Sequence, residues 1–448
     1  MEKAWLASKV RSRSSMNSPM RIVHVSTSDI AGGAGRAAHR LHSGLRRIGQ
    51  DSAMFVAERL SHDPTVRAWM PSGDVAVHPG AGSPLARAPR SLARYLKSRP
   101  PGSEFFSDDR HARGVDQVAQ LPEADVVNLH WVARFIDHRV FFSTVPPCTP
   151  VVWTLHDMNA FTGGCHYDAG CGRYVQRCGA CPQLGSDAAV DLSRHIWRRK
   201  HRSYEGIEAG RLHVVTPSRW LAGEARRSTL LGRFPVSVIP NAVDVEAFAP
   251  RDRRFARQVL GMHPDAEVVL FVADWADNRR KGLALLTEAL AGLSHRSRLL
   301  LLSVGHDKSM AENPVRNARR HLGPVSNERL LSVVYSAADV FVIPSVQDNL
   351  PNTVLEAMAC GTPVVGFSTG GVPDMVRPGH TGLLAPVGDG AALCQALDWL
   401  LQDEAGRSAM AANCRRIAVE EYALETQSRR YLELYRRICY GNGRDDDS

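Results

Sequence analysis

Short apolar runs of strand length alternate along the chain with segments whose apolar residues have helical spacing. The apolar runs cover residues 21–27, 53–56, 124–130, 151–156, 212–216, 267–273, 298–304, 340–343 and 363–367. Segments with helical spacing lie between many of them, for example residues 36–48, where Leu41, Leu45 and Ile48 share one face. Buried strands that alternate with helices are typical of parallel sheets. The pattern therefore predicts an α/β protein.

The stretch 341–374 combines this pattern with candidate chemistry. A strand is followed by a polar loop, a helix over 353–359, a second strand and the glycine pair 370–371, which is half of a nucleotide-binding sheet. Asp348 and Glu356 flank the turn into the helix. Free backbone N–H groups at a helix start favour an anion. Here they belong to Asn352, Thr353 and Val354. Carboxylates beside a phosphate cradle suit a nucleotide sugar, whereas a helix cap and a solvated side chain are the alternative for the acid pair.

This stretch resembles the Glu-x7-Glu signature of retaining glycosyltransferases with the GT-B fold, glycosyltransferase family 4 (glycosyl transferases group 1). The resemblance covers about residues 21–436. It implies that Glu356 holds the ribose hydroxyls of the donor and that the first acid contacts the transferred sugar near the reacting carbon. Asp348 stands where the family usually has Glu, and its side chain is one methylene shorter.

The resemblance also implies the domain organisation, and 448 residues are too many for one ordinary domain. We expect two Rossmann-like domains that face each other across a cleft, with a C-terminal helix that crosses back to the first domain. The expected parts are a flexible basic tail (1–20), the acceptor domain (21–235), the nucleotide-sugar domain (236–423), the returning helix (424–439) and a loose acidic tail (440–448).

A glycine loop, SDIAGGAG, follows the first strand. In GT-B enzymes this loop lies over the cleft and contacts the donor phosphates or the acceptor. The resemblance thus assigns Gly33 to the donor and Gly32 to the acceptor side. A tight turn that requires small residues is the alternative.

Two predicted strands end in histidine, at His130 and His156. The carboxyl ends of parallel strands meet at the edge where ligands bind. Neutral histidine can hold a sugar hydroxyl or a phosphate. The resemblance places His156 and Asp157 close to the donor sugar and the acceptor, with His156 in a catalytic role and His130 on the acceptor side. A structural histidine at a strand end is the alternative.

Arg280, Lys281 and Gly282 match a basic turn that clamps the donor diphosphate in the resembling family. Fixed cations stabilise the charge that develops on a nucleoside diphosphate leaving group. Asp274 occupies the position of the family's other arginine, so Arg279 or Arg280 is expected to supply the second charge. Basic side chains are otherwise mostly solvated.

Four cysteines lie in a glycine-rich loop, residues 163–185, with the spacing C-x5-C-x6-C-x2-C. They are Cys165, Cys171, Cys178 and Cys181. Such a set can bind a tetrahedral zinc ion, form one or two disulfides, or pack as free thiols. We expect a structural role, and we expect no cofactor to be required, because GT-B enzymes generally need no metal.

Composition and net charge limit the expected localisation and the classes of binding partner. The chain is 44% hydrophobic and 23% charged, no apolar run reaches the roughly 18 residues that span a bilayer, and the cysteines outside the cluster are scattered. We therefore expect a cytoplasmic protein. The net charge of +9 and the basic segments 86–100 and 191–204 leave open a peripheral contact with the membrane inner face or a simple solvated surface. No nucleic-acid-binding motif is present.

The sequence thus predicts a retaining glycosyltransferase. It would move a sugar from a nucleotide diphosphate donor to a saccharide or lipid-linked acceptor, in polysaccharide or glycoconjugate synthesis. Alternatives are a nucleotide-sugar epimerase on the same fold and an inactive GT-B-like binding protein.

Overall fold

The computed structural model of the chain describes residues 18–70, 90–110, 114–275, 278–306 and 318–441. Most of the predicted basic tail, most of the predicted acidic tail and residues 86–89 of the first basic segment lie outside the described residues.

The first domain is built on a seven-stranded parallel sheet in the order β3-β2-β1-β4-β5-β6-β7. Its strands are β1 (Arg21–Ser28), β2 (Asp51–Glu58), β3 (Val66–Ala68), β4 (Val126–Leu129), β5 (Val151–Thr154), β6 (Leu212–Thr216) and β7 (Val236–Val238). The strand order changes direction at β1, so the ends of β1 and β4 open at the switch point where doubly wound sheets bind ligands.

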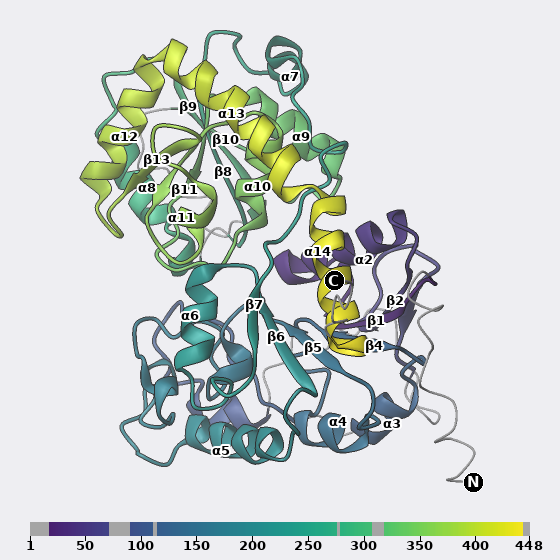
Figure 1. The fold of residues 1–448 in the computed structure, drawn as a ribbon. Coiled ribbons are helices and arrows are strands. Elements are labelled where there is room, and N and C mark those ends of the chain that lie inside the picture. Colours follow the sequence, from purple (N-terminus) through teal and green to yellow (C-terminus); the bar gives the residue numbers. More distant parts are fainter. Residues whose placement is uncertain (1–17, 71–89, 111–113, 276–277, 307–317, 442–448) are drawn as a thin grey trace, which may run out of the picture.

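A six-stranded parallel sheet forms the second domain, in the order β10-β9-β8-β11-β12-β13. The strands are β8 (Glu267–Trp275), β9 (Leu299–His306), β10 (Ala318–His321), β11 (Val340–Ile343), β12 (Val364–Phe367) and β13 (Gly382–Ala385). Figure 1 shows the two sheets in separate lobes, which confirms the predicted α/β class with two Rossmann-like sheets.

Helices connect the strands in both domains. They are α2 (Gly32–Arg47), α3 (Gly114–Ala119), α4 (His138–Thr144), α5 (Leu192–Glu205), α6 (Arg219–Arg227), α7 (Arg253–Val259), α8 (Leu283–Ala291), α9 (Glu328–Ala337), α10 (Asn352–Ala359), α11 (Val372–Met375), α12 (Gly390–Gln402), α13 (Glu404–Tyr422) and α14 (Leu424–Tyr440). Short 3-10 helices are η3 (Arg90–Tyr95), η4 (Asn159–Phe161), η5 (Arg173–Val175), η6 (Pro182–Leu184) and η7 (Arg279–Lys281). Among the described helices, none has both the length and the apolar character needed to cross a bilayer.

Both faces of each sheet are buried, which explains the apolar runs in the sequence. In β1, Val23 and Val25 belong to one hydrophobic cluster, whereas Ile22 belongs to a second one with residues of α2 and α14. In β8, Val268 and Val269 likewise pack into different clusters. Side chains alternate between the two faces of a strand, so a strand covered on both sides must be apolar at nearly every position.

Helix α14 packs on the first domain, where Figure 1 shows it beside α2. Its Tyr431 and Tyr435 are buried against Leu41 and Leu45 of α2. Asn128 Nδ2 donates a hydrogen bond of 2.7 Å to the Tyr435 hydroxyl, and the Tyr431 hydroxyl lies 3.0 Å from Thr154 Oγ1. The end of the chain is therefore anchored to the middle of the first sheet.

Helix α2 begins at Gly32, four residues before the start that apolar spacing predicts. The first turn contains glycine and alanine, which give no apolar period. Their small size lets the helix start pack closely against the end of β1, because a Cβ on Gly35 would lie 3.1 Å from the carbonyl oxygen of Ser28. The predicted glycine loop is thus largely the first turn of this helix.

The contact between α2 and α14 can be tested at Gly44. A Cβ there would lie 2.4 Å from Ser428 Oγ and 3.0 Å from the Leu424 carbonyl oxygen. We expect Gly44→Ala to lower the free energy of unfolding by about 1–3 kcal/mol, as overpacking does. Gly223→Ala in α6 is the matched control, since a Cβ there meets nothing within 4 Å. It should gain up to about 1 kcal/mol from helix propensity. Urea unfolding measures both, and a Gly44→Ala protein as stable as Gly223→Ala would contradict the tight packing.

Candidate active site

The loop between β11 and α10 brings Asp348 into a buried, positively charged setting. Asp348 is 5% exposed. Its Oδ2 lies 2.7 Å from Lys281 Nζ and 3.2 Å from Arg280 Nη1, and the Tyr167 hydroxyl donates to Oδ1 at 3.4 Å. Burial by itself disfavours the charged form, but the attraction of Lys281 and Arg280 outweighs it and lowers the pKa of Asp348 well below its usual value. The predicted sugar-contacting acid is therefore an ionised carboxylate at neutral pH.

Arg280 and Lys281 follow β8 in η7, and Arg280 reaches across the interface to the first domain. Arg280 Nε donates to Glu104 Oε1 at 2.7 Å, and its guanidinium lies 4.0 Å from the centre of the Tyr167 ring. Gly282 ends the turn with a φ of 74°, and a Cβ there would overlap the Pro344 carbonyl oxygen. The Arg-Lys-Gly turn thus presses both cations against the loop that carries Asp348.

Glu356 lies on the buried face of α10 and is 2% exposed. Its Oε2 accepts a hydrogen bond of 2.9 Å from the Tyr335 hydroxyl. Its Oε1 lies 2.8 Å from Nη2 of Arg40, which belongs to α2 of the first domain. Arg40 also contacts Glu328 at 2.7 Å. The predicted ribose-binding acid is therefore held in an ion pair that joins the two domains.

Sequence reasoning did not identify Arg40. Burial opposes its charge, but attraction to Glu356 and Glu328 raises its pKa above the usual arginine value. A signal was present, because Arg40 lies within the face of α2 that also buries Ala37 and Leu41. A cation on an apolar stripe indicates a buried partner.

The start of α10 meets the glycine-rich start of α2. Asn352 Nδ2 donates a hydrogen bond of 2.9 Å to the Gly33 carbonyl oxygen. A Cβ on Gly32 would lie 3.8 Å from Asp274 Oδ2, so the acid at the family's usual arginine position faces this turn. Pro351 precedes α10 and contributes no side-chain cap, while Thr353 is half-buried and Val354 is buried. The predicted anion cradle thus faces the first turn of α2 across the domain interface.

His156 follows β5 and joins the same region from the first domain. Asn349, next to Asp348, donates from Nδ2 to the His156 carbonyl oxygen at 3.1 Å. Burial lowers the pKa of His156 to about 4, so the imidazole is neutral at pH 7. His130 is 2% exposed and lies behind His156, with 3.0 Å between His130 Nδ1 and His156 Nε2.

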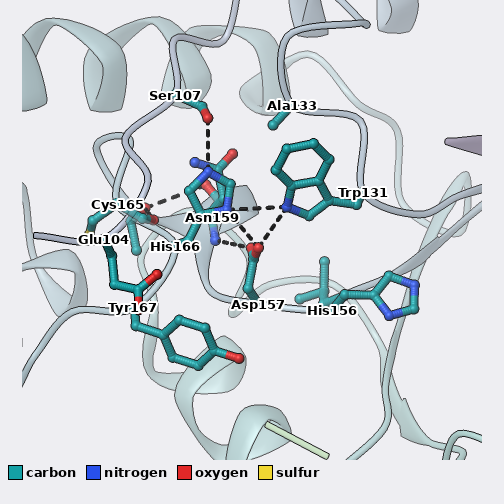
Figure 2. A network of polar contacts seen from close by, with 12 residues as sticks. Glu104, Ser107, Trp131, Ala133, His156, Asp157, Asn159, Cys165, His166 and Tyr167 are labelled. Carbon is teal, nitrogen blue, oxygen red and sulfur yellow. Dashed lines mark hydrogen bonds and ion pairs between the residues drawn. The ribbon is translucent and has the colours of Figure 1, made fainter. Parts of the chain in front are cut away.

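The Asp157 carboxylate takes part in a separate polar network (Figure 2). Its Oδ2 lies 2.6 Å from His166 Nδ1 and accepts a hydrogen bond of 2.8 Å from Trp131 Nε1. His166 Nε2 in turn lies 2.8 Å from Ser107 Oγ. Burial opposes the charge of Asp157, but its interactions with His166 lower its pKa. Although Asp157 is adjacent to His156 in sequence, its carboxylate therefore stabilises the loop around Trp131.

All four clustered cysteines line one small cavity of about 20 Å³ beneath the glycine-rich loop. Burial raises the pKa of Cys178 to about 12 and also raises the pKa of Cys165 and Cys181. The described residues contain no disulfide and no group of three or more His, Cys, Asp or Glu side chains arranged to hold a metal ion. The structural zinc ion stays a prediction, as does the disulfide alternative.

The predicted donor-binding residues and His156 therefore come from both domains and meet at one interface. Asp348, Lys281, Arg280 and Glu356 lie on the second domain, where each has a partner in direct contact. Gly33 and His156 face them from the first domain through Asn352 and Asn349. We call this set of contacts the domain interface site.

Part of the chain matches known proteins in sequence. Residues 266–403 match the family model described as Glycosyl transferases group 1. A D-inositol 3-phosphate glycosyltransferase of Corynebacterium urealyticum is 34% identical over 45% of this chain and 51% of its own length. An alpha-maltose-1-phosphate synthase of Mycobacterium tuberculosis is 30% identical over 48% of this chain and 62% of its own length. The chain thus spans about half the length of the curated relatives that it matches.

Solved structures cover more of the chain. A sucrose-phosphate synthase from Thermosynechococcus elongatus superposes with a TM-score of 0.65 at 20% identity, over 93% of this chain and 98% of its own. Anabaena HepE in complex with UDP and glucose superposes with a TM-score of 0.64 at 17% identity, over 93% of this chain and 99% of its own. These superpositions and the two parallel sheets show that the chain has the GT-B fold. Within the second domain, residues 266–403 match the group 1 glycosyl transferases, the family that the sequence resembles.

The ion pair between the domains gives a stability prediction. Arg40→Met removes the partner of buried Glu356, and breaking a buried pair costs about 3–5 kcal/mol. The double variant Arg40→Met/Glu356→Gln should recover much of this loss, because no buried charge is left unpaired at α10. Arg47→Met on the same helix is the control. Arg47 pairs with Asp244 and Glu425 but is 40% exposed, and such surface pairs contribute at most about 1 kcal/mol.

Urea unfolding of the four proteins measures these differences. A single Arg40→Met variant that is no less stable than Arg47→Met would contradict a buried pair that holds the domains together. So would a double variant that is as unstable as the single one.

Proposed function

We propose that the protein transfers a sugar from a nucleoside diphosphate donor to a hydroxyl of an acceptor, with retention of configuration. The observation that carries the proposal is the domain interface site. Two buried carboxylates, Asp348 and Glu356, lie on one loop and helix of the second domain, beside the basic turn 280–281 and opposite Gly33 and His156 of the first. The carboxylates can bind sugar hydroxyls and the basic turn can bind phosphates. The residues of the first domain can contact a second substrate at the same place.

For donor binding, we propose that Glu356 accepts hydrogen bonds from the ribose hydroxyls. Its carboxylate is held ready by Tyr335, while the oxygen now paired with Arg40 would exchange that partner for a hydroxyl. A donor therefore has to loosen an interdomain contact when it enters. Closure of the two domains around the donor would then exclude water, which otherwise hydrolyses the sugar phosphate bond.

Lys281 and Arg280 would bind the diphosphate. Both now neutralise Asp348, and a diphosphate between them and the helix start of α10 would share their charge. Cations fixed at the place where the leaving group gains charge lower the barrier to its departure. Asp348 would remain beside the sugar, where its ionised form can stabilise positive charge at the reacting carbon. Retention follows if the acceptor attacks from the face that the diphosphate leaves.

The donor and acceptor classes draw support from proteins that resemble the chain. HepE of Anabaena was crystallised with UDP-glucose and with UDP, which supports a uridine diphosphate sugar as the first donor to test. The names of two relatives specify phosphorylated saccharide or cyclitol compounds. We propose a saccharide or lipid-linked saccharide acceptor. Arg194 and Arg198 on α5 offer a charged surface for a lipid phosphate on the first domain.

Turnover assays test the assigned roles. Release of nucleoside diphosphate is measured for a panel of nucleotide sugars, with and without candidate acceptors. Glu356→Gln should lower kcat/KM about 10- to 100-fold, mostly through KM, because a hydrogen bond to a charged group contributes about 1.5–3 kcal/mol. Lys281→Ala should lower kcat by about 100- to 1000-fold, as loss of a transition-state contact does.

Glu433→Gln and Lys97→Ala are the matched controls, because both side chains are exposed on other surfaces. Both should retain wild-type kinetics. If folded Glu356→Gln and Lys281→Ala proteins behave like these controls, the assignment of the site is wrong.

A further inference from the structure

Three histidines from neighbouring strands form a hydrogen-bonded chain in the first domain. His24 lies in β1, and His130 and His156 follow β4 and β5. His24 Nδ1 is 2.9 Å from His130 Nε2, and His130 Nδ1 is 3.0 Å from His156 Nε2. His24 and His130 are buried, whereas His156 is half-buried at the outer end of the chain. Figure 2 shows the His156 ring directed away from the Asp157 carboxylate.

Neighbouring polar groups do not interrupt this chain. His42 lies 6.0 Å from His24 between ring centres, but its two nitrogens contact Ser52 Oγ and Thr65 Oγ1. The Asp157 carboxylate is engaged by Trp131 and His166. Each link of the chain is therefore a contact between two imidazole nitrogens, one of which must donate and the other accept.

All three rings are neutral at pH 7, because burial lowers the pKa of His24 and His130 well below the usual value and that of His156 to about 4. A neutral imidazole has one N–H and one acceptor nitrogen. Since each link uses Nδ1 of one ring and Nε2 of the next, the three tautomers are coupled. The chain has only two arrangements, in which all three rings carry the proton on Nδ1 or all three carry it on Nε2.

The inner end of the chain decides between these arrangements. His24 Nε2 is buried and has no hydrogen-bond partner among the described residues. The arrangement with every proton on Nε2 would place an N–H at this position without an acceptor. Buried N–H groups without a partner are rare in native proteins, more so than acceptors with an unused lone pair. The arrangement with every proton on Nδ1 is therefore favoured, and it presents an N–H at Nδ1 of His156.

We propose that His24 and His130 are positioning residues that fix His156 as a hydrogen-bond donor through Nδ1. The acceptor is an oxygen of the sugar or of the second substrate at the domain interface, and this part rests on the proposed function. The chain of three histidines makes Nδ1 of His156 a hydrogen-bond donor, whereas Nδ1 of a free imidazole can equally accept a hydrogen bond. His156 would thus favour ligands that offer a hydroxyl or ring oxygen with an available lone pair.

Tautomers can be measured without any substrate. Two-bond ¹H–¹⁵N NMR spectra of the full chain labelled with ¹⁵N-histidine, at pH 7, distinguish a proton on Nδ1 from one on Nε2. Signals are assigned through single His→Gln variants. We expect the Nδ1–H form for His24, His130 and His156. In His130→Leu, the His156 signals should shift toward a mixture of both forms, because the coupling is lost.

His213→Gln is the control. His213 lies in the adjacent strand β6 and contacts Ser237, so it is not part of the chain of three histidines. It should leave the His156 tautomer unchanged. An Nε2–H form of His156 in the wild type would overturn the proposal. An His156 tautomer that does not respond to His130→Leu would overturn it as well.

Kinetics provide a second readout. His130→Asn keeps an amide that can donate close to the former Nδ1, whereas His130→Leu keeps bulk without a donor. We expect His130→Leu to lower kcat/KM about 10- to 100-fold and His130→Asn to restore it to within about 3-fold of wild type. Equal losses in both variants would indicate packing alone and would overturn the positioning role. If the wild type turns over no nucleotide sugar, the proposed function fails, while the NMR result still decides the tautomer chain.

Discussion

A buried charge needs a partner, and in this protein the partner of Glu356 comes from the other domain. Arg40 on α2 lies 2.8 Å from the Glu356 carboxylate, although the two residues are 316 positions apart in sequence. Both side chains are almost fully buried, and an unpaired charge there would be costly. The contact therefore ties the relative position of the domains to the ionic state of the residue that we assign to donor binding.

Other polar and charged groups at the interface are also paired across the two domains. Asp348 is balanced by Lys281 and Arg280, and Arg280 is balanced in turn by Glu104 of the first domain. The loop around Asp348 is held from both sides, since Asn349 binds the His156 carbonyl and Gln347 Nε2 lies 2.8 Å from Asp168. Helix α14 returns the end of the chain to α2, the helix that carries Arg40. Ion pairs between side chains and hydrogen bonds from amide side chains thus join the two domains.

The fold and the second-domain half of the candidate site could be predicted from the sequence, because both depend on local patterns. Buried parallel strands are apolar at nearly every position, and Asp348, Lys281 and Glu356 lie in short motifs. Sequence reasoning missed Arg40, Tyr335 and the role of His24, because partners distant in sequence leave no local pattern. It placed the start of α2 too late, since glycine and alanine carry no apolar period. It also grouped Asp157 with His156, while packing turns that carboxylate toward Trp131 and His166.

The central claim is that Glu356 exchanges Arg40 for the ribose of a nucleoside diphosphate. Calorimetric titration of UDP and of 2′,3′-dideoxy-UDP into wild type and Glu356→Gln measures this exchange directly. The account predicts that removing the ribose hydroxyls weakens binding to wild type about 10- to 100-fold and changes binding to Glu356→Gln far less, because a hydrogen bond to a charged group contributes about 1.5–3 kcal/mol. Equal losses in both proteins, or no loss in wild type, would contradict it.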